Sequence, residues 1–148
     1  MSSSLQTYIL LSLVLVAVCV FALWKGGPAE RTGAAVIIVL VVLERLAHAL
    51  PQGWWPIISL CGDALTALGL LVIAIRYASF WLGGVMLLYA AQFTLHSFYL
   101  VTGRSSDTPL HIIINDLNFA AILVCLTAGT TMAWRARLRA AKDAPAAS

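Results

Sequence analysis

Eight polar residues that could do chemistry fall within long apolar stretches of this 148-residue chain. Carboxylates and imidazoles in such surroundings bind cations or small polar ligands, or they carry protons. A charge at the centre of a membrane helix costs on the order of 3 kcal/mol, so these side chains usually pair inside a bundle. We therefore expect one polar cluster. Its members are Glu44, Arg45, His48, Asp63, Gln92, His96, Asn115 and Asp116.

Helical spacing places several of these residues on shared faces. Residues four positions apart lie one above the other on an α-helix, so their side chains are neighbours. The spacing therefore predicts short polar stripes within the apolar helices. The pairs with this separation are Glu44 and His48, Gln92 and His96, and His111 and Asn115.

The acidic residues of the set lie at one depth. Glu44, Asp63 and Asp116 are each about six residues, or roughly 9 Å of helix, inside the same edge of the apolar runs. We expect them in one plane below the outer membrane surface. Arg45 points about 100° away from Glu44, so we expect it to pair with Asp63 or Asp116, or to extend outward.

Several kinds of site have no support in the sequence. There is no H-x-x-x-H, H-E-x-x-H or C-x-x-C pair, so we predict no metal site. There is no G-x-S-x-G motif and no phosphate-binding glycine loop, so we assign no catalytic residue. Cys19, Cys61 and Cys125 lie in apolar runs and are expected to pack as small apolar side chains. The sequence leaves any cofactor unknown.

Helices that cross a bilayer must position the polar residues. The chain is 61% hydrophobic and 10% charged, whereas a soluble domain carries about 25% charged residues. A helix needs about 20 apolar residues to cross the hydrocarbon core. We predict an all-α integral membrane bundle of five transmembrane helices over residues 1–134, followed by a basic tail over residues 135–148. The predicted helices are residues 5–24, 32–50, 57–75, 80–101 and 110–134.

The ends of the predicted helices follow from local signals. Residues 25–31 are expected to form a loop, because Gly26, Gly27 and Pro28 interrupt a helix. The first run, residues 5–24, is too long for the apolar region of a signal peptide and follows no basic residue, so we expect it to be retained. Gly62 and Gly69 give the third helix a small face that permits close contact with a neighbour.

The distribution of basic residues predicts an orientation. With five spans, seven of the nine Lys and Arg residues fall on one side of the membrane, and cytoplasmic loops are the ones rich in these residues. We therefore expect an N-terminus outside and a cytoplasmic C-terminus in the inner membrane of a bacterium, and no nucleic-acid partner. The seven residues are Lys25, Arg31, Arg76, Arg135, Arg137, Arg139 and Lys142.

Short motifs between Trp24 and about Tyr99 resemble those of one group of proteins. The chain is similar to small, uncharacterised bacterial polytopic membrane proteins with a GGPxER loop after the first transmembrane helix. The resemblance implies a membrane fold and implies no activity. Its motifs are residues 26–31, Asp63, Arg76-Tyr77, Phe80-Trp81 and the stretch from Gln92 to His96.

Two functions follow from the polar cluster. The first is a non-enzymatic accessory or structural subunit, whose cluster holds the bundle together or contacts a membrane protein partner or a second copy. The alternative is a protein that binds or transports a small ligand, a cation or protons at an outward-facing site including Glu44, Asp63, His96 and Asp116. A structural network predicts paired side chains without a cavity, whereas a ligand site predicts a pocket lined by several of them.

Overall fold

The computed structural model describes residues 3–47, 55–104 and 108–143. These residues form five α-helices and no strand, so the predicted all-α fold is confirmed. The helices are α1 (Ser3–Lys25), α2 (Pro28–Ala47), α3 (Trp55–Tyr77), α4 (Phe80–Thr102) and α5 (Pro109–Asp143).

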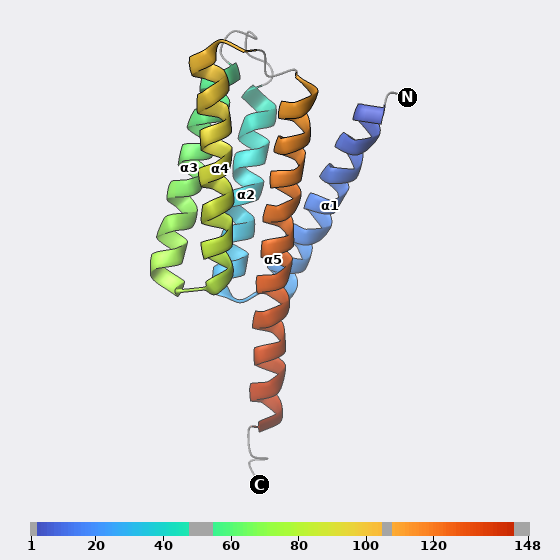
Figure 1. The fold of residues 1–148 in the computed structure, drawn as a ribbon. Helices are drawn as coiled ribbons and strands as arrows, with labels where there is room; N and C mark the ends of the chain where they lie inside the picture. The colour runs from blue at the N-terminus through green and yellow to red at the C-terminus, as the bar shows by residue number, and fades with distance from the viewer. Residues whose placement is uncertain (1–2, 48–54, 105–107, 144–148) are drawn as a thin grey trace.

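Helices α2, α3, α4 and α5 form an antiparallel bundle (Figure 1). Helix α1 packs against α2 and α5 and leans away from the bundle toward its own N-terminus. Two-residue connections at 26–27 and 78–79 make α1–α2 and α3–α4 antiparallel neighbours. Both connections lie at the end of the bundle from which α5 projects. We call this end, which carries Lys25, Arg31 and Arg76, the basic end.

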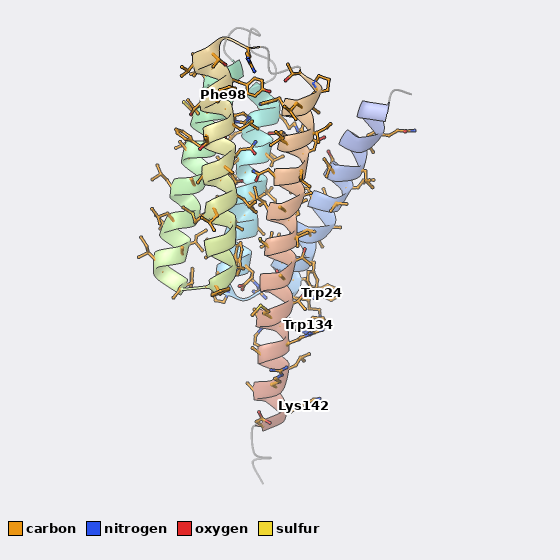
Figure 2. The ribbon with its side chains drawn as sticks, in the orientation of Figure 1. Trp24, Phe98, Trp134 and Lys142 are labelled. Carbon is orange, nitrogen blue, oxygen red and sulfur yellow. The ribbon has the colours of Figure 1, made fainter. Side chains whose placement is uncertain are left out.

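The helices and their surface indicate a membrane protein. The segments Leu60–Tyr77, Phe80–Thr102 and Pro109–Asp143 are long and apolar enough to cross a bilayer, and Ile9–Lys25 is a shorter apolar segment. Figure 2 shows side chains extending outward all around the bundle. Many of these are large and apolar, which suits a surface covered by lipid rather than water.

Small residues allow close packing inside the bundle. Gly69 of α3 lies against Val36 of α2, since a Cβ at Gly69 would be 3.3 Å from a Val36 methyl carbon. Cys19 of α1 is buried, as predicted for an apolar packing residue. Gly62, predicted on the same close face as Gly69, instead borders a cavity. The largest fully buried apolar side chains are Ile37, Leu70, Leu82, Val85, Ile122 and Leu126.

The connection between α1 and α2 is shorter than the sequence predicts. The predicted loop over residues 25–31 is wrong, because α1 continues to Lys25 and α2 begins at Pro28. Proline fits the first position of a helix, where its missing N–H has no helical partner. Glu30, two residues later, accepts a hydrogen bond from the Gly27 backbone N–H at 2.9 Å and thereby caps the new helix.

The C-terminal part of α5 is fixed to the last turn of α1. α5 has 35 residues and is therefore about 52 Å long, well beyond the roughly 30 Å hydrocarbon core. The helix thus continues through most of the predicted tail. Arg137 donates a hydrogen bond to the Lys25 carbonyl oxygen. The Lys25 Nζ lies 4.2 Å from the Trp24 ring and 5.3 Å from the Trp134 ring, which share one level in Figure 2.

A buried carboxylate, Glu30, lies at the basic end, in a segment that the sequence predicts as a loop. Glu30 is 4% exposed, and its Oε1 accepts hydrogen bonds from Trp81 Nε1 at 2.8 Å and from Ser79 Oγ at 3.4 Å. The Trp81 ring packs on Gly33 of α2 and Gly129 of α5. This junction ties α2, α4 and α5 together at the basic end.

Candidate functional site

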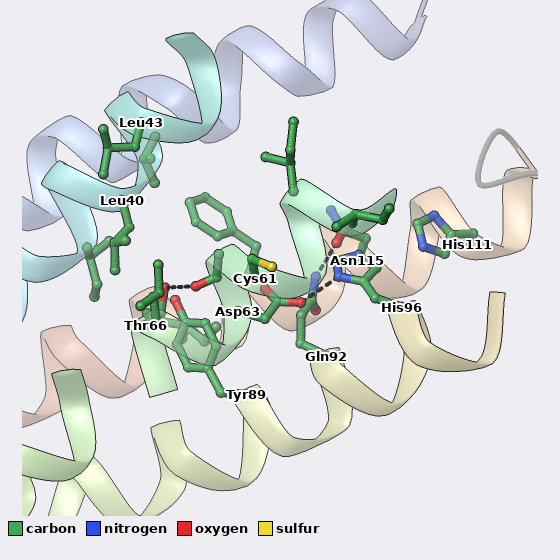
Figure 3. Close-up of a pocket in the computed structure, with 18 residues that line it drawn as sticks. Leu40, Leu43, Cys61, Asp63, Thr66, Tyr89, Gln92, His96, His111 and Asn115 are labelled. Carbon is green, nitrogen blue, oxygen red and sulfur yellow. Dashed lines mark hydrogen bonds and ion pairs between the residues drawn. The ribbon is translucent and has the colours of Figure 1, made fainter. Parts of the chain in front are cut away.

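A cavity of about 450 Å³ lies between α2, α3, α4 and α5, in the half of the bundle farther from the basic end (Figure 3). This volume is within the range of small-molecule sites. Most of the wall is apolar, and one side is polar. The polar and aromatic lining residues are Cys61, Asp63, Thr66, Tyr89, Gln92, His96, His111, Asn115 and Phe119.

Asp63 of α3 and His96 of α4 lie at ion-pair distance on the polar side of the cavity, and both members are charged only when His96 is protonated. The His96 Nδ1 lies 2.5 Å from the Asp63 Oδ2, and each side chain is 14% exposed. A carboxylate only accepts, so the imidazole N–H donates to it. The pair joins two neighbouring helices. It also leaves the second carboxylate oxygen of Asp63 able to accept a hydrogen bond from another donor.

An aromatic stack continues from His96 toward the end of the bundle. The His96 and His111 ring centroids are 5.4 Å apart, and Tyr99 meets His111 edge-on at 4.5 Å. The Tyr99 and Thr108 hydroxyl groups are 3.1 Å apart, within hydrogen-bond distance. These contacts hold the buried His111 ring at one end of the cavity.

Side-chain amides join α4 to α5 beside the ion pair. Gln92 donates a hydrogen bond to the Asn115 Oδ1. In return, Asn118 donates to the Gln92 Oε1 at 2.6 Å and to the Leu88 carbonyl oxygen at 3.1 Å. Gln92 and Asn115 line the cavity, yet their amides already bond to each other. Their main contribution is to hold the two helices in register around the cavity.

The structure brings four of the eight predicted site residues to the cavity wall: Asp63, Gln92, His96 and Asn115. Two others do not line the cavity: Arg45 is an exposed residue of α2, and Asp116 is partly buried on α5. The side chain of Glu44 and the whole of His48 lie outside the described residues.

Two features of the cavity wall differ from the sequence-based expectation or were missed by it. Cys61 was expected to be packed among apolar residues, but it is exposed and lines the cavity. Cys125 is half-buried beside Gly84, in keeping with a packing role. Tyr89 also lines the cavity; its helical spacing predicts a polar stripe shared with Gln92 and His96, but the predicted cluster did not include it.

The described residues around the cavity do not form a metal centre. In residues 3–47, 55–104 and 108–143, no group of three His, Cys, Asp or Glu side chains is placed to hold a metal ion. The Asp63–His96 pair is instead suited to donating and accepting hydrogen bonds, and the aliphatic wall is suited to an apolar body.

No protein-family model, curated protein or solved structure matches this chain.

Proposed function

We propose that this chain is a membrane protein that binds a small ligand in the cavity beside Asp63 and His96. The observation that carries the proposal is a mostly apolar cavity of about 450 Å³ with the Asp63–His96 pair on one wall. Small-molecule sites typically combine a mostly apolar lining with a few convergent polar groups. Of the two functions that the sequence favours, the cavity supports ligand binding.

The difference between the Gln92–Asn115–Asn118 amide network and the Asp63–His96 pair supports ligand binding. Gln92, Asn115 and Asn118 bond to one another across α4 and α5, as a network that only holds helices together would do. Asp63 and His96 also pair and face the cavity, as Gln92 and Asn115 do, but the second carboxylate oxygen of Asp63 can still accept a hydrogen bond from a ligand. Placing charged groups in a membrane is costly, and a purely structural pair gains nothing from an adjacent cavity.

The proposal includes five spans, an N-terminus outside and a C-terminus in the cytoplasm of a bacterial inner membrane. Support comes from the two ends of the bundle. Lys25, Arg31 and Arg76 share the basic end with the projecting part of α5, whereas Arg104 lies at the opposite end. Cytoplasmic segments are enriched in basic residues, so the basic end is the cytoplasmic one. The cavity then lies in the outer half of the membrane.

A role as an accessory subunit is the second candidate, and the projecting part of α5 favours it. Arg135, Arg139 and Lys142 are exposed and are spaced by four and three residues, so they share one face of the helix. Arg137 lies on the other side, bound to the Lys25 carbonyl oxygen. The basic face is available to an acidic segment of another membrane protein or of a second copy.

Native mass spectrometry of the purified chain tests the ligand proposal. The protein is extracted from its own membrane in mild detergent, and the bound mass is measured on the intact complex. We expect a small molecule on the wild type and its loss in Asp63→Asn and His96→Ala. Asp116→Asn is the matched control, because Asp116 is an acidic residue of similar depth outside the cavity wall. A stably bound protein on a chain that carries no small molecule would instead support the subunit role.

A further inference from the structure

The cavity reaches the surface of the bundle between α2 and α3. Leu43 of α2 and Leu65 of α3 both line the cavity, and they are 53% and 58% exposed. Cys61, one turn before Leu65 on α3, also lines the cavity and is exposed. The cavity wall is therefore continuous with the outside of the molecule at this place, which we call the α2–α3 opening.

The two edges of the α2–α3 opening belong to apolar stripes on the outer surface. On α3, Leu65 shares a stripe with Leu68 and Val72, three and seven residues later, which are 59% and 65% exposed. On α2, Leu43 shares a stripe with Leu46, which is 66% exposed. Long apolar stripes on a membrane protein face hydrocarbon, so the α2–α3 opening faces lipid.

The polar wall lies deeper than the opening. Asp63 and His96 are each 14% exposed, and Figure 3 shows them on the far side of the cavity from Leu40 and Leu43. A molecule that comes through the α2–α3 opening therefore meets aliphatic side chains first. Its polar end can then reach the Asp63–His96 pair while its apolar body stays against α2.

The charges on the wall select the kind of polar end. The Asp63 carboxylate already accepts a hydrogen bond from His96, Gln92 and Asn115 are neutral amides, and the described residues that line the cavity include no Lys or Arg. A permanently charged headgroup would leave an unbalanced charge in an apolar surrounding, which is costly. A hydroxyl or carbonyl group would only need hydrogen bonds, which the carboxylate and the imidazole provide.

We propose that the cavity takes up an uncharged amphipathic molecule, with an apolar body and a hydroxyl or carbonyl head, directly from the bilayer through the α2–α3 opening. This inference rests on the proposed ligand-binding function and adds the class of ligand and its route.

Labelling of Cys61 in lipid vesicles tests the route. The Cys19→Ala/Cys125→Ala variant keeps Cys61 as the single thiol. Its labelling by lipid-soluble pyrene maleimide is compared with its labelling by a membrane-impermeant sulfonated maleimide. We expect reaction with the lipid-soluble reagent. Adding Leu65→Trp narrows the opening and should slow the reaction about tenfold, equivalent to roughly 1.4 kcal/mol in the barrier. Leu68→Trp is the matched control, since Leu68 is on the same stripe but outside the cavity wall.

Protection of Cys61 tests the class of ligand. 4-Octylphenol in the vesicles should protect the thiol, whereas octylbenzenesulfonate and octylphenyl-trimethylammonium, with the same apolar body and charged heads, should not. Equal protection by a charged probe overturns the proposed class. If Leu43→Trp and Leu65→Trp in the single-thiol background leave the labelling rate of Cys61 unchanged, and the impermeant reagent also reaches Cys61, the route is wrong. The ligand-binding function would still stand. Absence of any small molecule in native mass spectrometry would instead remove the function itself.

Discussion

Trp81 of α4 donates its indole N–H to the buried carboxylate of Glu30 on α2, 51 positions away in the chain, at 2.8 Å. The same carboxylate caps α2 by accepting the Gly27 backbone N–H. A carboxylate that is 4% exposed needs such donors to replace the water it has lost. One side chain therefore fixes both the α1–α2 connection and the position of α4 at the basic end.

Replacing Trp81 by Phe should destabilise the folded chain by about 1.5–3 kcal/mol, because a hydrogen bond to a charged acceptor is lost inside the protein. Reversible unfolding of the purified protein in mixed micelles measures the effect. Trp24→Phe is the control, since Trp24 is 71% exposed and should lose far less stability. Equal losses for both variants would mean that the Glu30 contact contributes no stability.

Replacing Gly129 by Ala should destabilise the chain by about 1–3 kcal/mol through overpacking. A Cβ at Gly129 would lie 2.4 Å from the Trp81 ring, so the indole that bonds to Glu30 must move. Gly83→Ala is the matched control on α4, because a Cβ there meets nothing within 4 Å. The control should be neutral or stabilising by up to about 1 kcal/mol, since Ala favours helix. Similar unfolding midpoints for the two variants would contradict the packing described.

Local features of the fold were predictable from the sequence, and the contacts between helices were not. The prediction of residues 80–101 for the fourth helix is close to α4 (Phe80–Thr102), because Gly103 adopts φ 62° and ends the helix, as glycine readily does. Glu30 was placed in a loop, although its capping bond to Gly27 is local, and its indole partner depends on how α2 meets α4. No spacing in the sequence indicates a partner 51 positions away.

In the candidate site, too, features of a single helix were predictable from the sequence and contacts between helices were not. Gln92 and His96 were grouped correctly on one face, because a separation of four residues is a property of one helix. Arg45 was expected to pair with Asp63 or with Asp116, or to extend outward. On the cavity wall, Asp63 instead pairs with His96. The cavity itself was not predictable. It depends on volume left unfilled beside Gly62 and Cys61, which only the packing of four helices determines.

Replacing Arg137 by Ala should loosen the junction between α1 and α5. Arg137 donates to the carbonyl oxygen of Lys25, the last residue of α1, which has no partner within its own helix. We expect faster hydrogen exchange of the α1 amides in the turn before Lys25, with little change in global stability because the contact is exposed. Arg135→Ala removes an equal charge and should leave this exchange unchanged. Faster exchange in both variants would point to a general charge effect instead.

Cysteine accessibility in intact cells should confirm five spans and their orientation. Single cysteines in a cysteine-free background are treated with an impermeant maleimide before and after permeabilisation. The basic end should be labelled only after permeabilisation, because cytoplasmic segments are the basic ones. Positions on both sides of the membrane are needed, because one helix that does not cross would place every later position on the opposite side from the one predicted. The outer positions are Gln6, Gln52 and Arg104, and the inner ones are Arg31, Arg76 and Arg139. Labelling of Arg104→Cys and Arg139→Cys from the same side would show that α5 does not cross the membrane. The cavity could not then lie in the outer half of the membrane.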